Sequence, residues 1–192
     1  MNNLKRLAVY CGSAPGSNPL FADAARDTAR AMVERGVDLV YGGGRLGLMG
    51  IVADSVLDLG GRVDGVIPEA LVNLEVAHEG VTELYRVETM HERKAKMTEL
   101  ADAFLALPGG IGTLDELFEA WRWNALGYHA KPFCLLNVDG FWDGLIEFMD
   151  HATSSGFLSK QRRSQLLVAS TPVEALEMLD EAAAAATQGM VW

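Results

Sequence analysis

Short apolar runs alternate with longer amphipathic segments along almost the whole chain, and this alternation constrains the fold more than any other feature of the sequence. The short, strand-like runs cover 6–11, 37–41, 62–67, 84–87, 103–107, 132–138 and 166–169. The segments between them have helical periodicity and cover 18–35, 47–59, 89–101, 113–126, 141–155 and 172–185. Strands that alternate with helices form βαβ units. We therefore expect one α/β domain spanning 1–192, a doubly wound, Rossmann-like parallel sheet with helices on both faces.

Glycine clusters follow three of the expected strands. The turns read Cys11-Gly-Ser-Ala-Pro-Gly16, Tyr41-Gly-Gly-Gly-Arg-Leu-Gly-Leu-Met-Gly50 and Pro108-Gly-Gly-Ile-Gly-Thr113. Each turn leads into a helix, so its backbone N–H groups can face an anion with help from the helix dipole. Such a sheet binds ligands outside the carboxyl ends of its strands, near the point where the strand order reverses. Three glycine turns at this edge predict a ligand that carries phosphate.

The composition limits which partners the chain can attract. With 16 Lys and Arg against 26 Asp and Glu, the 192 residues have a formal net charge of −10. Nonspecific binding to nucleic acid or to an anionic membrane needs a positive field, so we expect neither partner. An anion site must then be made locally, by helix ends and a few placed cations. The short basic stretch at 160–163 is expected to be a solvated face.

Several features predict a cytoplasmic protein. No apolar run approaches the ~18 residues that a membrane-spanning helix needs. The apolar run at 7–11 is shorter than the core of a signal peptide, which has about 7–15 residues. Cys11 and Cys134 both lie in expected strands, and we interpret them as buried reduced thiols rather than as a disulfide.

Other nucleotide and metal motifs fit the sequence poorly. The glycines at 42, 44 and 47 have dinucleotide-binding spacing, but they follow the second expected strand rather than the first. The acidic residue at the required distance is Asp64, which lies inside a strand and not at its end. The chain has no Gly-Lys pair, which excludes a Walker A loop. The four histidines are scattered without metal-ligand spacing, so we expect no metal site.

The segment that starts at Thr89 predicts a helix with an unusual inward face. Thr89 and Glu92 have capping-box spacing, which places the helix start here. At 100° per residue, Arg93 and Lys94 fall on the same stripe as Met97. Two adjacent cations on an inward stripe are costly unless an anion meets them. The alternatives are a ligand that carries the anion, or cations that snorkel or pair with a buried acid.

Glu116 has two interpretations at this stage. Thr113 and Glu116 also have capping-box spacing, which would make Glu116 a cap of the helix that follows the third glycine turn. A carboxylate beside a phosphate-binding turn is equally well placed to act on a ribose or a water. The spacing alone allows both roles.

Three motifs together resemble the Lonely Guy family of cytokinin riboside 5′-monophosphate phosphoribohydrolases. They are the second glycine turn, the stretch Met90-His-Glu-Arg-Lys94 and the stretch Pro108-Gly-Gly-Ile-Gly-Thr-Leu-Asp-Glu116. The likeness runs from about residue 5 to residue 180, with the motifs in family order. Many relatives carry the label lysine decarboxylase, but the sequence has no motif for a pyridoxal phosphate site.

The resemblance implies a catalytic pair and a substrate site. Arg93 and Glu116 correspond to the family's catalytic residues. The positions that correspond to its substrate site are Glu75, Met90, Lys94, Gly109, Gly110, Gly112 and Thr113. Within this set, Glu75 corresponds to a glutamate near the base, and the residues at 109–113 correspond to the loop that holds the 5′-phosphate.

The resemblance further implies a homodimer whose pocket lies close to the subunit interface, with no metal or redox cofactor. Arg122 stands where the family often has Thr, a departure that concerns the far side of the pocket and the choice of base. The expected reaction is hydrolysis of an AMP-type nucleotide, with or without a substituent on N6. Two alternatives are a nonenzymatic nucleotide carrier on the same fold and an enzyme similar to the nucleoside deoxyribosyltransferases.

Overall fold

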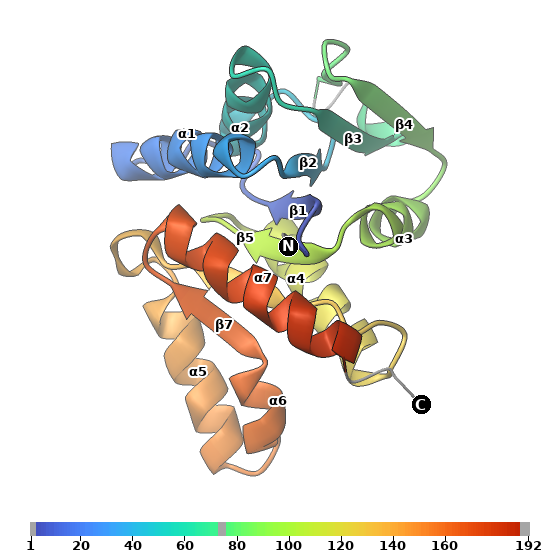
Figure 1. The fold of residues 1–192 in the computed structure, drawn as a ribbon. Helices are drawn as coiled ribbons and strands as arrows, with labels where there is room; N and C mark the ends of the chain where they lie inside the picture. The colour runs from blue at the N-terminus through green and yellow to red at the C-terminus, as the bar shows by residue number, and fades with distance from the viewer. Residues whose placement is uncertain (1–2, 73–75, 189–192) are drawn as a thin grey trace.

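A computed structural model of the chain describes residues 3–72 and 76–188 (Figure 1). Its sheet has seven parallel strands in the order β4-β3-β2-β1-β5-β6-β7. The strands are β1 (Arg6–Tyr10), β2 (Asp38–Tyr41), β3 (Val63–Pro68), β4 (Glu83–Val87), β5 (Ala103–Ala106), β6 (Phe133–Leu136) and β7 (Leu166–Ala169). The chain moves outward from β1 on both sides, so the strand order reverses between β1 and β5. Ligands of doubly wound sheets bind at this position.

Helices cover both faces of the sheet, as the alternating pattern predicts. The helices are α1 (Pro19–Glu34), α2 (Gly47–Asp58), α3 (Met90–Leu100), α4 (Ile111–Ala125), α5 (Asp143–Ser154), α6 (Lys160–Ser164) and α7 (Pro172–Gln188), with short 3-10 turns at Glu69–Leu71 and Val138–Gly140. One core cluster joins α1, α2 and α7 to one face, and a second joins α3, α4 and α5 to the other. Four residues of β1 follow strand alternation: Leu7 and Val9 enter the first cluster, Ala8 and Tyr10 the second. The predicted fold class is confirmed.

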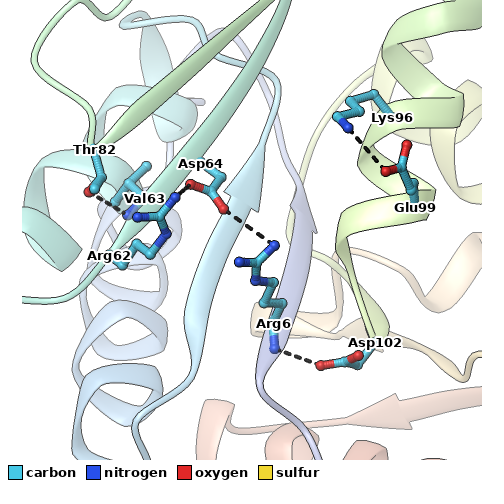
Figure 2. Close-up of polar contacts among 8 residues, drawn as sticks. All are labelled: Arg6, Arg62, Val63, Asp64, Thr82, Lys96, Glu99 and Asp102. Atoms are coloured by element: carbon cyan, nitrogen blue, oxygen red, sulfur yellow. Dashed lines mark hydrogen bonds and ion pairs between the residues drawn. The ribbon is translucent and has the colours of Figure 1, made fainter.

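Apart from the first residues of β1 and β2, which are half-buried, strands β1, β2, β3, β5 and β6 are fully buried. This burial explains why their apolar runs are nearly continuous. All six residues of β3 are buried, and one of them is Asp64. Figure 2 shows how this carboxylate is held at the amino edge of the sheet. Arg62 Nη2 donates to Asp64 Oδ1 at 2.6 Å, and Arg6 Nη1 lies 3.8 Å from Oδ2. Asp64 therefore lies at the edge opposite the ligand edge, so it does not take the ribose-binding place of a dinucleotide fingerprint.

The basic stretch at 160–163 forms most of α6, a helix that is too short to give a periodic pattern. Lys160 and Gln161 are exposed, as expected for a solvated face, whereas Arg162 and Arg163 are half-buried. Arg162 Nη2 donates to the Ala125 carbonyl at 2.6 Å, and Arg163 Nε lies 2.7 Å from Asp150 Oδ1. These contacts connect α6 to the end of α4 and to α5.

The expectations for the cysteines are confirmed. Cys11 and Cys134 are both buried free thiols. Burial raises the pKa of the Cys134 thiol to about 12, so it stays protonated at neutral pH. Within the described residues, no helix is both long enough and apolar enough to cross a bilayer.

Candidate active site

The third glycine turn and the first turn of α4 form the base of the candidate site. Gly110 is the N-cap of α4, and its carbonyl accepts the first helical hydrogen bond from Leu114 N at 3.1 Å. No side chain caps this helix start, so the first N–H groups are not satisfied by a capping side chain. The helix dipole adds partial positive charge at the same place. This end of α4 can therefore hold an anion.

The predicted capping box at Thr113 and Glu116 is wrong. Helix α4 begins two residues earlier than expected, so Thr113 lies inside its first turn and Glu116 in its second. Thr113 is buried, and its Oγ1 has no hydrogen-bond partner among the described residues. The capping interpretation of Glu116 therefore fails on geometry.

Arg93 is a buried cation at the carboxyl ends of β2 and β3. Its side chain enters from α3, and the residue is only 3% exposed. Nε donates to the Val66 carbonyl at 3.1 Å, and Nη2 donates to the Gly42 carbonyl at 2.7 Å. A Cβ at position 42 would overlap Nη2, so any larger residue there would displace the guanidinium. The inward position predicted for Arg93 is confirmed, and two carbonyl oxygens fix the plane of its guanidinium.

A cavity of about 230 Å³ connects these parts at the switch point between β1 and β5. It brings together Arg93, Glu116 and the start of α4. Its lining residues are Cys11, Gly12, Ser13, Met49, Leu71, Met90, Arg93, Gly110, Ile111, Gly112, Thr113, Asp115 and Glu116. A larger hollow of about 750 Å³ lies around Lys131 and Arg162, but it contains neither a glycine turn nor the start of a helix. We therefore place the chemistry in the smaller cavity.

Backbone hydrogen bonds join the three glycine turns into one unit. Gly12 N donates to the Pro108 carbonyl at 3.1 Å, and Leu48 N donates to the Gly12 carbonyl at 3.0 Å. Gly47 has φ +58°, and the backbone of Ser13 leaves no room for a side chain there. All three turns line the cavity, the second through Met49, and the second turn also holds Arg93 through the Gly42 carbonyl.

The negative charge of Glu116 affects the pKa of Tyr10, the last residue of β1, and of Cys11, which follows it. Burial raises the pKa of the Cys11 thiol, and the negative charge of Glu116 raises it further. Burial also raises the pKa of Tyr10, with Glu116 and then Glu119 adding to the effect. Both groups stay protonated near neutral pH, so neither competes with Glu116 as the charged group of the cavity.

Lys94 does not line the cavity. Its Nζ forms ion pairs with Asp115 (3.1 Å to Oδ2) and with Glu119, which connect α3 to α4. Burial lowers the pKa of Lys94, but the hydrogen bonds to Glu119 and Asp115 outweigh this effect, so the pKa is raised. For Lys94, the structure favours the interpretation as a cation paired with acids.

The remaining predicted residues divide into three groups. Met90, Gly110, Gly112 and Thr113 line the cavity, while Gly109 lines an adjoining hollow of about 310 Å³. Arg122 is exposed and lines a separate apolar groove beside Trp121. Glu75 lies outside the described residues. Ser13 and Leu71 line the cavity without having been predicted; the glycine turn was the only signal for Ser13, and nothing in the sequence indicated Leu71.

No metal site accompanies this arrangement in the described part of the chain, where no three His, Cys, Asp or Glu side chains come together as ligands. The cavity instead offers backbone N–H groups, one buried guanidinium and two carboxylates, of which Asp115 is paired with Lys94 and the other belongs to Glu116. These groups suit a phosphorylated sugar whose anomeric carbon lies near the carboxylate.

Comparison with known proteins identifies the family of the chain. A family model described as "possible lysine decarboxylase" matches residues 49–179. The chain is 49% identical to the cytokinin riboside 5′-monophosphate phosphoribohydrolase LOG of Oryza sativa subsp. japonica, over 100% of this chain and 79% of the relative. It is 46% identical to LOG2 of Arabidopsis thaliana, over 94% of this chain and 84% of the relative. The chain belongs to the Lonely Guy family.

Solved structures support the fold of this Lonely Guy protein. A structural genomics target solved by X-ray diffraction superposes with a TM-score of 0.70 at 25% identity, covering 92% of this chain and 99% of the other. The molybdenum cofactor carrier protein from Chlamydomonas reinhardtii superposes with a TM-score of 0.71 at 18% identity, covering 94% and 98%. At that identity, the likeness to the carrier shows a shared fold alone.

Proposed function

We propose that this Lonely Guy protein hydrolyses the N-glycosidic bond of adenosine 5′-monophosphates, including those substituted on N6. The products are the free base and ribose 5-phosphate. The sequence identity of 46–49% to named phosphoribohydrolases over at least 92% of the chain supports this reaction. The observation that carries the proposal is the meeting of Arg93, Glu116 and the uncapped start of α4 in one cavity.

In the proposed complex, the 5′-phosphate binds at the start of α4. The N–H groups of Gly112 and Thr113 lie in the first helical turn, where the helix dipole favours an anion. Gly109 and Gly110 shape the turn before it, and Met90 closes the cavity from α3. Lys94 contributes indirectly in this arrangement, because it holds α3 against α4 through its acidic partners. We keep Glu75 as a residue near the base on the family resemblance alone.

Glu116 is the proposed catalytic carboxylate. Cleavage at the anomeric carbon passes through a state in which the ribose carries positive charge. A carboxylate beside the ribose stabilises that charge and orients or deprotonates the attacking water. The water oxygen bonds to C1′, the bond from C1′ to the base breaks with its electron pair going to the base, and the base gains a proton. No redox or metal step is needed for this balance.

Arg93 is the second proposed catalytic group. Two of its nitrogens donate to backbone carbonyls, so the guanidinium is held in place before substrate arrives. From this position it clamps the phosphate or holds Glu116. Burial away from water strengthens either interaction.

Glu116→Gln tests the proposal. With AMP and with isopentenyladenosine monophosphate as substrates, released base is measured by chromatography. The variant keeps the shape of the side chain but loses its charge, so we expect turnover to fall by about 10²–10⁴-fold. Glu147→Gln, the same change at an exposed carboxylate on α5, serves as the control and is expected to keep full activity. Rates of Glu116→Gln near those of the wild type would rule out the assignment.

The same assay separates the alternatives. Tight binding of AMP without release of base would favour a nonenzymatic carrier. Exchange of the base when a second free base is added would favour sugar transfer of the deoxyribosyltransferase kind. The ratio of rates on the two nucleotides reports the preference for a substituted base.

We further propose that the protein works as a cytoplasmic homodimer with the cavity near the interface. The motivating feature is Ile111, an apolar side chain at the cavity that is 88% exposed. A second copy that covers Ile111 would remove this surface from water. Light scattering during size-exclusion chromatography is expected to give twice the 20.7 kDa chain mass. Ile111→Glu is expected to shift this mass toward the monomer, whereas a monomeric wild-type protein would contradict the proposal.

A further inference from the structure

Residues 76–78 form a brace on the second glycine turn. Gly44 and Ala77 form an antiparallel bridge. His78 N donates to the Gly43 carbonyl at 2.9 Å, and Arg45 N donates to the Val76 carbonyl at 2.9 Å. The turn is therefore held by hydrogen bonds from a segment that lies more than thirty positions away in the sequence.

The His78 side chain anchors this brace to α2. The residue is 4% exposed, and its Nδ1 accepts a hydrogen bond from Gly80 N at 3.2 Å. Because Nδ1 acts as an acceptor, the ring hydrogen resides on Nε2. Nε2 then donates to Asp54 Oδ1 at 2.8 Å. One imidazole thus joins the brace to helix α2, and the hydrogen bonds at both ring nitrogens fix its orientation.

The braced turn also holds Arg93. Gly42, the residue before the hydrogen-bonded Gly43, accepts from Arg93 Nη2 at 2.7 Å. Hydrogen bonds and the chain between them therefore run without a break from Asp54 through His78 and the glycine turn to the guanidinium. A shift of the turn would move one of the two carbonyls that orient Arg93.

We infer that His78, oriented by Asp54, is a positioning residue that fixes Arg93 through the second glycine turn. This inference rests on the proposed catalytic role of Arg93. His78 does not line the cavity, and its effect on the reaction passes through the Gly42 carbonyl. The four histidines lack metal-ligand spacing, and His78 has this positioning role instead.

The kinetic test changes Asp54 rather than the buried histidine, because the Asp54 side chain is 49% exposed and its loss leaves the core intact. Asp54→Ala removes the acceptor, and we expect kcat for AMP to fall by about tenfold with KM within about twofold. Asp54→Asn keeps an acceptor oxygen and is expected to restore most of kcat. Asp58→Ala, at an exposed position on the same helix, is the matched control and should behave as wild type.

A second measurement does not depend on turnover. The Arg93 Nε–H donates to a buried carbonyl, so its side-chain NMR signal should exchange slowly with water, and its loss in Arg93→Lys assigns it. We expect this signal to exchange faster in Asp54→Ala and to recover in Asp54→Asn. If the wild type released no base, the proposed function would fail while this measurement still decided the inference. An Arg93 signal and kcat that are unchanged in Asp54→Ala would overturn the inference, as would Asp54→Asn behaving like Asp54→Ala.

Discussion

Arg93 keeps a positive charge in a place where water hardly reaches. Burying an isolated ion costs several kcal/mol, so such a charge needs compensation from nearby polar groups. The carbonyls of Val66 and Gly42 supply part of it, because each accepts a hydrogen bond from the guanidinium. The same contacts make the guanidinium rigid. Stability and preorganisation of the site therefore depend on the same two hydrogen bonds.

Gly42→Ala tests whether the contact with the Gly42 carbonyl positions the Arg93 guanidinium. The added Cβ would overlap Arg93 Nη2, so the guanidinium must move away from the Gly42 carbonyl. We expect kcat/KM for AMP to fall by about 10–100-fold, because a small displacement of a positioned group is costly in catalysis. Gly144→Ala, where a Cβ meets open space, is the control and should keep full activity. Equal activity of the two variants would contradict the importance of this contact.

At the residue scale, the sequence predicts where Arg93 and Lys94 lie but not which groups they contact. The 3.6-residue period placed Arg93 and Lys94 on the inward stripe of α3, and both side chains are indeed largely buried. The partners of Lys94 come from α4, about twenty positions later, and nothing in the local pattern identifies them. Pairing between distant elements is decided by packing, which a single sequence does not display.

At the scale of elements, the strands were the most predictable part. Buried parallel strands give continuous apolar runs, and the predicted ends of the seven strands fall within two residues of the observed ends. The start of α4 was misplaced because a capping-box spacing outweighed the helix-starting geometry of Gly110. Helix α6 was missed because five residues are too few to show a period.

The connection between α4 and β6 carries His129, whose titration makes the stability of the fold depend on pH. His129 packs beside Phe104, and its Nδ1 accepts from Lys131 N at 3.2 Å. The pKa of His129 is lowered to about 4, because burial and then the charge of Lys131 lower it by more than a backbone hydrogen bond with Ala120 raises it. The folded state thus favours the neutral ring. Its stabilising contribution is complete above the unfolded pKa of about 6.5 and is lost as the pH falls toward 4.

His129→Asn tests this pH dependence, because the Asn oxygen can still accept from Lys131 N but does not titrate. Urea unfolding at pH 7.5 and pH 4.5 gives the free energy of unfolding for both proteins. After allowance for partial exposure, we expect the wild type to lose on the order of 1–2 kcal/mol more than the variant on acidification. Equal losses would show that His129 is not responsible for the acid sensitivity.

The whole molecule carries a net charge of −10, yet its proposed substrate is a dianion. The two are compatible because the proposed attraction is short-ranged, from one helix start and one buried guanidinium, whereas the repulsion comes from distributed surface carboxylates. Salt screens exposed charges within about 10 Å at 0.1 M and buried ones much less. The two effects can therefore be separated by ionic strength.

We expect kcat/KM for AMP to stay level or to rise by up to about threefold between about 20 and 300 mM NaCl, because salt weakens the repulsion more than the local attraction. Initial rates at low substrate concentration measure this ratio directly. Size-exclusion chromatography at each salt concentration controls for a change in assembly. A fall of about tenfold would mean that exposed cations, rather than the start of α4 and Arg93, capture the substrate.

The central position of β1 has a consequence for synthesis of the chain. One neighbour, β2, begins at Asp38, but the other, β5, begins at Ala103 and pairs through Leu7 with Ala103. A growing polypeptide emerges from the ribosome amino end first, so the β5-facing edge of β1 waits without its partner while some ninety further residues are made. An open strand edge is a template for wrong pairing. The strand order therefore leaves this edge of β1 open to wrong pairing until β5 has been made.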